Sequence, residues 1–440
     1  MIRRPLRIAT TQQLERSVRT AGFEAYRLPK IASEDFHRSL KQRLEDGPVY
    51  RAFLEKHDID LLLDFNTAAL TLITPDTEPD KVMLTNAALG IPYVACYLDP
   101  ITSTMNQVRW ADHWQLLESE SWIKWVWESA HAEELRKLGI PNVLSLPMAA
   151  ADLDYDEGPL PPQSNAPPVA FMGHPATAWF GSDHAPTPRS LFAAMTAAAV
   201  QSDMPDVCFH KIYYDLYEFA ELPQPSDELL VRSQKSLDYY GQKFAFNAFL
   251  AVKQRDRFAH FLKRKLGDQF ELIGDHWGEN YGLDHTPRIW DRTALQARIR
   301  ETPICLNLMK GGLETGMNVR HFEIPSAGGF MLTYQTAELE TCFTIGQECE
   351  VFRCEADLLE KIQFYLENPG KRAEIARAGQ RRTLREHLYS HRIAKLVELL
   401  HECGVLPKKL LSSKSAAVER PAISMVDESP ISLPQTRIAK

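Results

Sequence analysis

The 440-residue chain lacks three features that would place it in a specialised class. It has no apolar run of the roughly 20 residues that a membrane-spanning helix requires, and stretches such as SLFAAMTAAAV near Ala193 are far shorter. It has no basic surplus, because 58 acidic residues outnumber 50 basic ones, which argues against a nucleic-acid partner. Its seven cysteines lack the paired CxxC spacing of a zinc site, so we expect no metal site and reduced, mostly buried thiols.

The beginning of the chain also lacks the pattern of a signal peptide. Arg3 and Arg4 follow Met1, but no hydrophobic segment comes after them, and the sequence turns polar at once. We therefore expect a cytoplasmic protein with no transmembrane segment.

What the sequence does contain is the composition of a multidomain globular protein. The apolar fraction of 44% and the charged fraction of 25% are ordinary for such proteins. This length corresponds to about two to three domains, which is enough to enclose a cleft.

Strand-forming and helical patterns alternate along the chain. In the first part, short apolar runs occur at 6–10, 23–28, 61–65, 93–97, 123–127 and 143–146. In the second part, they recur at 169–173, 270–277, 304–309 and 330–334. Helical segments separate many of these runs, and this alternation predicts parallel, doubly wound α/β sheets.

Proline and acidic residues mark a boundary between the two parts. Residues 152–168 read DLDYDEGPLPPQSNAPP, which suits an exposed connection and not a core element. We predict an N-terminal domain at 1–151, a linker at 152–168 and a C-terminal domain at 169–404. Residues 405–440 lack periodicity, which predicts a disordered tail.

The stretch NVRHFEIPSAGG places four polar side chains at the start of a predicted helix over 318–327. Asn318 would begin the helix, and Arg320 and Glu323 would lie on one face, about one turn apart. There they can hold a phosphate and a neighbouring diol, while Gly311 and Gly312 let the backbone approach the ligand. A surface ion pair between Arg320 and Glu323 is the alternative interpretation.

Weaker candidates lie at strand ends that would face a cleft. Gly173 ends the run at 169–173 and His174 follows it, where both can approach ligand phosphates, although His174 is more often an ordinary loop residue. Gly274 and Trp277 close the run at 270–277, where the Trp ring can stack on a base or sugar or simply cover the sheet. Asp99 can hold or deprotonate an acceptor hydroxyl, or cap a helix.

NVRHFEIPSAGGFMLT also looks like the signature of the CgeB-type, spore-protein glycosyltransferase-like family within glycosyl transferases group 1. FELIGDHW, ICLNLM and the region 343–393 are similar to further parts of that family, so the resemblance covers about 169–400 well and the first half more loosely. It implies the GT-B architecture, two facing Rossmann-like domains with a cleft between them. It also implies that Tyr389, His391 and Arg392 begin a last helix that crosses back to the first domain, for structure and not for chemistry.

The resemblance implies roles for particular residues. Glu323 would hold the donor ribose as the second acid of a pair, but the first acid would fall at Thr315, so the chain departs from the pattern there. Glu314, one residue away, is the candidate substitute. Arg320 and Lys310 would neutralise the leaving diphosphate without a metal, a role that a helix N-terminus can share; for Lys310 a solvated loop position is an equal alternative.

The expected function is therefore a metal-independent glycosyltransferase that uses a nucleotide-diphosphate sugar as co-substrate, needs no cofactor and acts on an acceptor that the sequence does not specify. A non-catalytic sugar-nucleotide-binding or coat-associated protein on the same fold is a second hypothesis, which the missing acid at Thr315 keeps open. A nucleotide-sugar epimerase or hydrolase is a third, because a fold does not decide a function.

Overall fold

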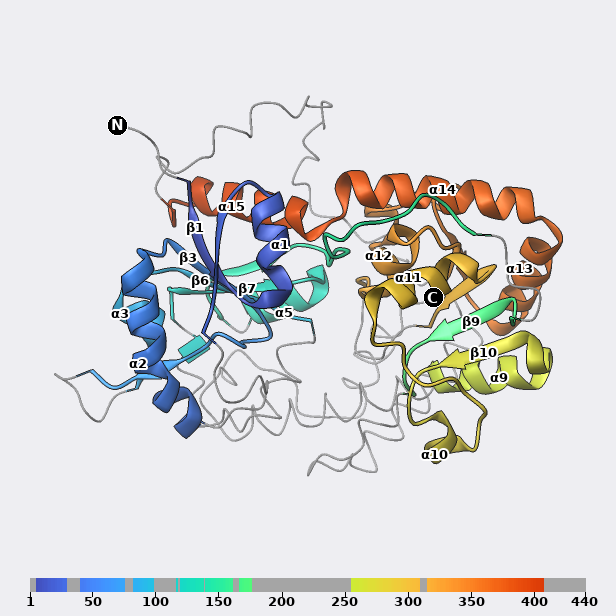
Figure 1. The fold of residues 1–440 in the computed structure, drawn as a ribbon, viewed down its shortest axis with the longest axis horizontal. Coiled ribbons are helices and arrows are strands. Elements are labelled where there is room, and N and C mark those ends of the chain that lie inside the picture. Colours follow the sequence, from blue (N-terminus) through green and yellow to red (C-terminus); the bar gives the residue numbers. More distant parts are fainter. Residues whose placement is uncertain are drawn as a thin grey trace, which may run out of the picture.

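The computed structural model describes residues 5–29, 40–75, 82–98, 116–117, 119–137, 139–160, 166–175, 255–308 and 315–406. Within these ranges the chain forms two domains that lie side by side, each built around one parallel sheet (Figure 1). The predicted α/β class is confirmed. The predicted tail at 405–440 lies almost entirely outside the described residues.

The N-terminal domain contains a six-stranded parallel sheet with the order β2-β1-β3-β6-β7-β8. Its strands are β1 (Arg7–Thr10), β2 (Glu24–Arg27), β3 (Leu61–Phe65), β6 (Tyr93–Cys96), β7 (Trp122–Val126) and β8 (Val143–Ser145). Its helices are α1 (Gln12–Thr20), α2 (Leu40–His57), α3 (Thr85–Ala88) and α5 (Ser129–Lys137). A small antiparallel pair, β4 (Leu72–Ile73) and β5 (Met83–Leu84), lies beside α2 and α3.

The C-terminal domain contains a five-stranded parallel sheet with the order β10-β9-β11-β12-β13. Its strands are β9 (Val169–Met172), β10 (Phe270–Ile273), β11 (Ile304–Asn307), β12 (Met331–Tyr334) and β13 (Glu350–Phe352). The helices are α9 (Arg257–Leu266), α10 (Trp277–Tyr281), α11 (Arg292–Glu301), α12 (Arg320–Ser326), α13 (Glu355–Glu367), α14 (Pro369–Glu386) and α15 (Tyr389–Glu402), with 3₁₀ turns η4 (Gly267–Gln269) and η5 (Leu339–Thr341).

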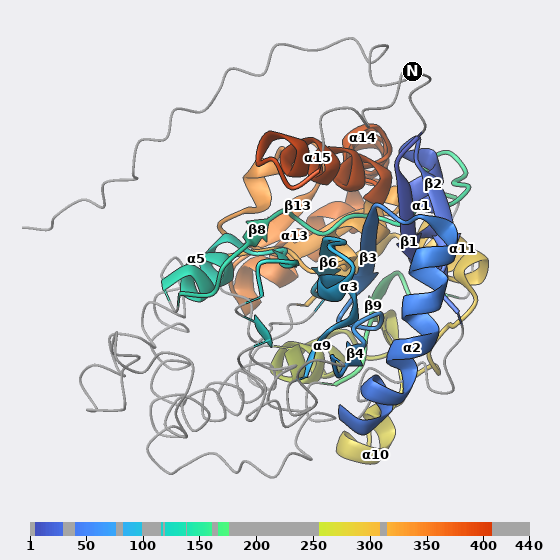
Figure 2. The ribbon, with the colours of Figure 1, turned by 90° about the vertical axis from the view of Figure 1, so that its left-hand side faces the viewer.

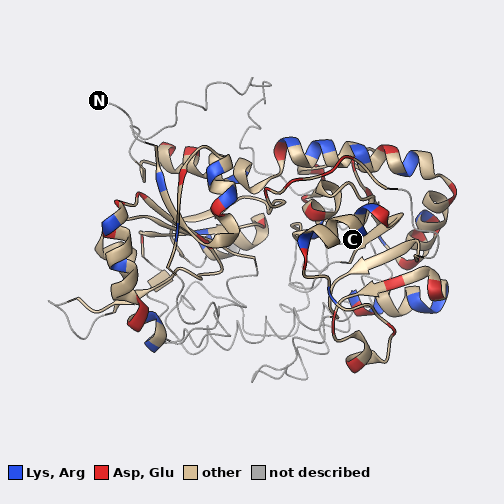
Figure 3. Cartoon of the chain, in the orientation of Figure 1, with Lys and Arg blue, Asp and Glu red and all other residues tan. Residues whose placement is uncertain are grey.

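Helices cover both faces of each sheet, which explains why the central strands β3, β6, β9 and β11 are buried along their whole length. In the N-terminal sheet Ile8 packs toward α1 and α15, whereas its neighbour Ala9 packs toward α2. In the C-terminal sheet Phe171 packs toward α9 and α13, whereas Met172 packs toward α11 and α12. Charged side chains lie mainly on the helices and loops, and the strands carry few of them (Figure 3).

The two sheets share one topological feature. In each, the second strand pairs with one edge of the first and the third pairs with the other, so the winding reverses between β1 and β3 and between β9 and β11. The connections leave these neighbouring strands in opposite directions, which opens a crevice at their carboxyl ends. Both crevices contribute to the cavity described below.

The last two helices join the domains. α14 lies over the C-terminal domain and α15 over the N-terminal one (Figures 1 and 2), and α15 contributes Ile393, Leu396 and Val397 to the core that includes Leu14 and Val18 of α1. Two parallel α/β domains with a last helix that returns to the first are the arrangement that the GT-B resemblance implied. The described residues confirm it.

The predicted helix and the predicted linker compare with the structure as follows. The helix predicted over 318–327 is shorter, because α12 has seven residues and Val319 occupies its N-cap. The described part of the predicted linker, 152–160 and 166–168, contains no helix or strand. The domain boundaries stay a prediction.

The six described cysteines are free thiols and four of them are buried. None of the described helices has the length and apolar character needed to cross a bilayer.

The crossing helix yields a prediction about stability. Leu396 of α15 is fully buried against the N-terminal sheet, so Leu396→Ala should lower the free energy of unfolding by about 2–5 kcal/mol. Lys395→Ala is the control, because this side chain is half exposed and only pairs with Glu398. Urea denaturation followed by tryptophan fluorescence measures the free energy of unfolding of both variants. If Leu396→Ala lowers it as little as Lys395→Ala does, the packing of α15 on the N-terminal sheet is contradicted.

Candidate functional site

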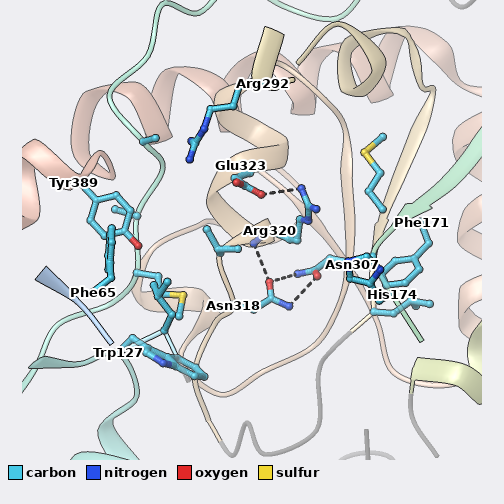
Figure 4. A pocket seen from close by; sticks show the side chains of 18 of the residues that line it. Phe65, Trp127, Phe171, His174, Arg292, Asn307, Asn318, Arg320, Glu323 and Tyr389 are labelled. Carbon is cyan, nitrogen blue, oxygen red and sulfur yellow. Dashed lines mark hydrogen bonds and ion pairs between the residues drawn. The ribbon is translucent and has the colours of Figure 1, made fainter. Parts of the chain in front are cut away.

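A cavity of about 420 Å³ lies between the two domains. Figure 4 shows Phe65, Trp127 and Tyr389 on one side of it and Phe171, His174 and Asn307 on the other. The described residues that complete its lining are Gln13, Leu98, Met148, Ala149, Ala151, Met172, Gly173, Arg255, Arg292, Leu308, Asn318, Val319, Arg320 and Glu323.

The cavity lies where the winding of both sheets reverses. Phe65 ends β3 and Gln13 belongs to the helix that follows β1, so the N-terminal crevice contributes one side. Gly173 and His174 follow β9 and Asn307 ends β11, so the C-terminal crevice contributes the other. Ligands of open α/β sheets bind at such points.

One face of α12 and the turn before it are tied to the sheet. The side-chain amides of Asn307 and Asn318 pair reciprocally, with N···O distances of 3.1 and 3.2 Å. The His321 ring contacts Asn307 and Asn318 through Nδ1, and Thr333 of β12 through Nε2 at 3.0 Å. Burial lowers the pKa of His321 to about 3, so its ring is neutral at pH 7. These residues fix the position of α12 and leave its next side chains to face the cavity.

The second face of α12 presents Arg320 and Glu323 to the cavity. The Arg320 Nη1 atom lies 2.8 Å from the Glu323 Oε2 atom, and both side chains are about a quarter exposed. Arg320 and Glu323 therefore form an ion pair, which was one interpretation, and they also line the cavity, which the ligand-binding interpretation requires. Asn318, the third predicted residue, lines it too and accepts a hydrogen bond from the Arg320 amide at 3.0 Å.

Arg255 is a cavity residue that the sequence analysis missed. Its Nη1 donates to the backbone oxygen of His174 at 3.1 Å and its Nη2 approaches that of Leu308 at 3.4 Å. Its Nε atom is buried and has no hydrogen-bond partner among the described residues. Burial lowers the pKa of Arg255 to about 10; the charge of Asp256 opposes this shift and the nearby charge of Arg320 adds to it. No motif marks this residue, which lies just ahead of α9.

The C-terminal side of the cavity is positively charged. Arg255, Arg292 and Arg320 face one carboxylate, Glu323, which leaves a formal charge of +2 among the described lining residues. Burial lowers the pKa of His174, so this ring adds no charge at pH 7. Such a surface favours an anionic ligand.

The predicted residues at the strand ends divide into two groups. Gly173 and His174 line the cavity as expected. Gly274 does not, because its backbone packs on that of Gly173, whose oxygen would lie 2.4 Å from an added Cβ atom. Trp277 is fully buried and donates from Nε1 to the Gly173 oxygen at 2.8 Å. Its ring has no exposed face for a base or sugar, which corrects the stacking prediction. Gly274 and Trp277 both contact the backbone of Gly173, and neither lines the cavity.

Thr315, where the resembling family has an acid, lies at a contact between the domains. Glu128 follows β7 and accepts hydrogen bonds from the amides of Thr315 at 2.5 Å and Gly316 at 3.1 Å. In the other direction, Glu338 accepts a hydrogen bond from the Ser129 amide at 2.9 Å and from the Thr315 hydroxyl at 2.7 Å. We call these residues the interdomain clasp. Neither glutamate lines the cavity.

Several predicted residues lie outside the described ranges: Asp99, Lys310, Gly311, Gly312 and Glu314. Their roles stay predictions. Among the described residues no group of three or more His, Cys, Asp and Glu side chains is suited to a metal ion, and metal independence also stays a prediction.

Tyr389 was expected to serve structure alone, yet it reaches the cavity. The first turn of α15 is held by hydrogen bonds from the Ser390 amide to Asp152 at 3.0 Å and from the Tyr389 amide to the Ala150 oxygen at 2.9 Å. This anchoring directs the Tyr389 ring between the domains, beside Phe65.

Residues 254–398, about a third of the chain, match the family described as glycosyl transferase-like. No curated protein sequence matches the chain.

Among solved structures, sucrose-phosphate synthase from Thermosynechococcus elongatus is 11% identical, with a TM-score of 0.48 over 91% of this chain and 100% of that one. A glycosyltransferase from Rickettsia africae is 9% identical, with a TM-score of 0.42 over 90% and 98%. Anabaena HepE, solved with UDP and glucose, is 10% identical, with a TM-score of 0.41 over 90% and 100%.

The interdomain clasp leaves no room for a side chain at Gly316. An added Cβ atom would lie 3.0 Å from both Glu128 Cβ and Trp127 Cζ3, so Gly316→Ala should lower the free energy of unfolding by about 1–3 kcal/mol. Gly370→Ala is the control, because nothing lies within 4 Å of its added Cβ atom. Urea denaturation of the two variants compares them; equal stability would show that the clasp tolerates the methyl group.

Proposed function

We propose that the chain is a glycosyltransferase of the CgeB-like type that moves a sugar from a nucleotide-diphosphate sugar to an acceptor, without a bound metal or cofactor. The observation that carries this proposal is the cationic side of the cavity at the carboxyl ends of β9 and β11. The glycosyl transferase-like match over 254–398 supports it, because these residues include Arg255, Arg320 and Glu323.

The diphosphate would lie against Arg255 and Arg320. Two phosphate groups carry negative charge that grows on the leaving oxygen when the bond to the sugar breaks, and fixed cations stabilise that charge. Arg255 is already oriented by two backbone oxygens, and its buried Nε atom has no described partner. A phosphate oxygen supplies the acceptor that this arrangement lacks.

Glu323 would hold the ribose. Its side chain is about a quarter exposed toward the cavity, and Arg320 contacts its Oε2 atom. A carboxylate can accept hydrogen bonds at both oxygens, so Glu323 can pair with Arg320 and still accept from adjacent ribose hydroxyls. The ion pair then places the phosphate-binding cation next to the ribose-binding acid.

The group that acts on the acceptor hydroxyl belongs to the proposal as well. Asp99 and Glu314 remain its candidates, and both lie outside the described residues. Glu323 is the one acid among the described residues that line the cavity, and its pairing with Arg320 suits binding better than proton transfer.

Removing Arg255 tests the diphosphate site. UDP, GDP, ADP, dTDP and CMP are titrated calorimetrically into the protein in EDTA, and we expect one diphosphate to bind. Arg255→Ala should weaken its binding about 10- to 100-fold, because a charge-assisted hydrogen bond contributes about 1.5–3 kcal/mol. The control is Arg257→Ala, which removes the same charge two residues away, where the side chain is half exposed and pairs with Glu355.

Binding of no diphosphate, or equal losses in the two arginine variants, would refute the proposal. In that case the second hypothesis, a non-catalytic protein on the same fold, would have to explain the cationic cavity.

Glu323 is tested with the diphosphate that binds and its 2′,3′-dideoxy analogue. If the carboxylate accepts from both ribose hydroxyls, the wild-type protein should bind the analogue about 10- to 100-fold more weakly than the parent diphosphate. Glu323→Ala should bind both equally, because the partner of the hydroxyls is gone. A variant that still discriminates between the two ligands would show that Glu323 serves only to pair with Arg320.

A further inference from the structure

The two sides of the cavity differ in charge. All charged side chains among its described lining residues belong to the C-terminal domain: Arg255, Arg292, Arg320 and Glu323. The opposite side consists of neutral residues, with Phe65 and Trp127 from the N-terminal domain and Tyr389 from α15. We call these three residues the aromatic wall. The part of a ligand that contacts the aromatic wall would therefore pack against aromatic rings, and these three residues offer it no charged partner.

The proton of the Tyr389 hydroxyl has no acceptor among the described residues. The residue is only 6% exposed and its ring packs edge-on against Phe65, with ring centroids 5.2 Å apart. Its Oη atom makes no well-formed hydrogen bond among the described residues, although the Ala149 backbone lies close enough to act on it and oppose the rise of its pKa. A buried hydroxyl without a partner costs about 1–3 kcal/mol, and buried tyrosine hydroxyls usually find one. Burial raises the pKa of Tyr389 well above its ordinary value, so the hydroxyl keeps its proton and can donate it.

Further hydroxyls without described partners lie at the carboxyl ends of β1 and β3, outside the lining of the cavity. Thr10 is the last residue of β1 and Thr67 follows β3 by two positions, at the two strands where the winding reverses. The hydroxyls of both residues, and that of Thr11, are buried without described partners. Thr11 holds the N-cap position of α1, yet its side chain makes no capping bond. The carboxyl edge of the N-terminal sheet therefore has hydrogen-bonding capacity that the described residues do not use.

We propose that the aromatic wall binds the acceptor, that the acceptor is a neutral sugar ring, and that the Tyr389 hydroxyl donates a hydrogen bond to it. This inference rests on the proposed function, since it assigns the acceptor half of the same cavity. A sugar ring combines an apolar face, which suits Phe65 and Trp127, with hydroxyls that can satisfy Tyr389. A charged acceptor would lose its water without gaining a counter-charge from the described residues on this side, and a purely apolar one would leave the Tyr389 hydroxyl without an acceptor.

The experiment uses protein saturated with the diphosphate that binds. Ligand-observed NMR titrations follow methyl β-glucoside and cellobiose as neutral probes, glucose 6-phosphate as a charged probe and toluene as an apolar one. We expect the neutral sugars to bind more tightly than the other two probes. Tyr389→Phe should weaken neutral-sugar binding about three- to tenfold, the value of one neutral hydrogen bond. Its diphosphate affinity and melting temperature should not fall, because the hydroxyl makes no well-formed hydrogen bond among the described residues.

Tyr26→Phe is the matched control, because it removes a tyrosine hydroxyl on β2 that bonds to Glu24 away from the cavity. It should leave sugar binding unchanged. The inference is wrong if neutral sugars fail to bind, if a charged or apolar probe binds more tightly, or if Tyr389→Phe binds them as well as the wild type does. It is also wrong if Tyr389→Phe weakens diphosphate binding, which would assign the hydroxyl to the donor. Failure of the diphosphate to bind wild-type protein is a separate result, and it would overturn the proposed function itself.

Discussion

The buried carboxylate of Glu128 holds the two domains in register beside the cavity. A charged group that is 2% exposed needs hydrogen-bond donors, and the amides of Thr315 and Gly316 in the other domain supply them. Glu338 makes the reciprocal contact to Ser129. Because Trp127 directly precedes Glu128, the contact that joins the domains also fixes a ring of the aromatic wall. The two halves of the cavity are therefore positioned by one set of hydrogen bonds, together with the crossing of α15.

This arrangement divides the cavity by charge because each domain contributes a different kind of strand end. The C-terminal crevice contains backbone oxygens that orient Arg255. The positive charge of the arginines that line this crevice is only partly balanced by Glu323. The N-terminal crevice contains ring faces, and hydroxyls that have no partner among the described residues lie at its strand ends. Unsatisfied polar atoms cost free energy in the empty protein, and a ligand that pairs with them recovers it. A ligand with an anionic half and a neutral, hydroxylated half fits both sides.

Local patterns in the sequence predict the parts of the structure that depend on local physics. β3 occupies 61–65 as predicted, because a continuous apolar run suits a strand that is buried on both faces. α12 begins later than predicted, because Asn318 uses its side chain to pair with Asn307 and to accept from the Arg320 amide. Arg255 and Tyr389 carry no local signal of a site. Both reach the cavity through tertiary packing, Arg255 by way of the β9 and β11 loops and Tyr389 by way of the anchored start of α15.

Thr315 shows what a departure from a family pattern can mean physically. A carboxylate at this position would lie against Glu128 and Glu338, and three acids in contact would repel one another. The threonine hydroxyl instead donates to Glu338, and the backbone amide donates to Glu128. The position has thus become part of the contact between the domains. Since neither glutamate lines the cavity, they do not replace the missing acid, and the candidate substitute Glu314, which lies outside the described residues, stays a prediction.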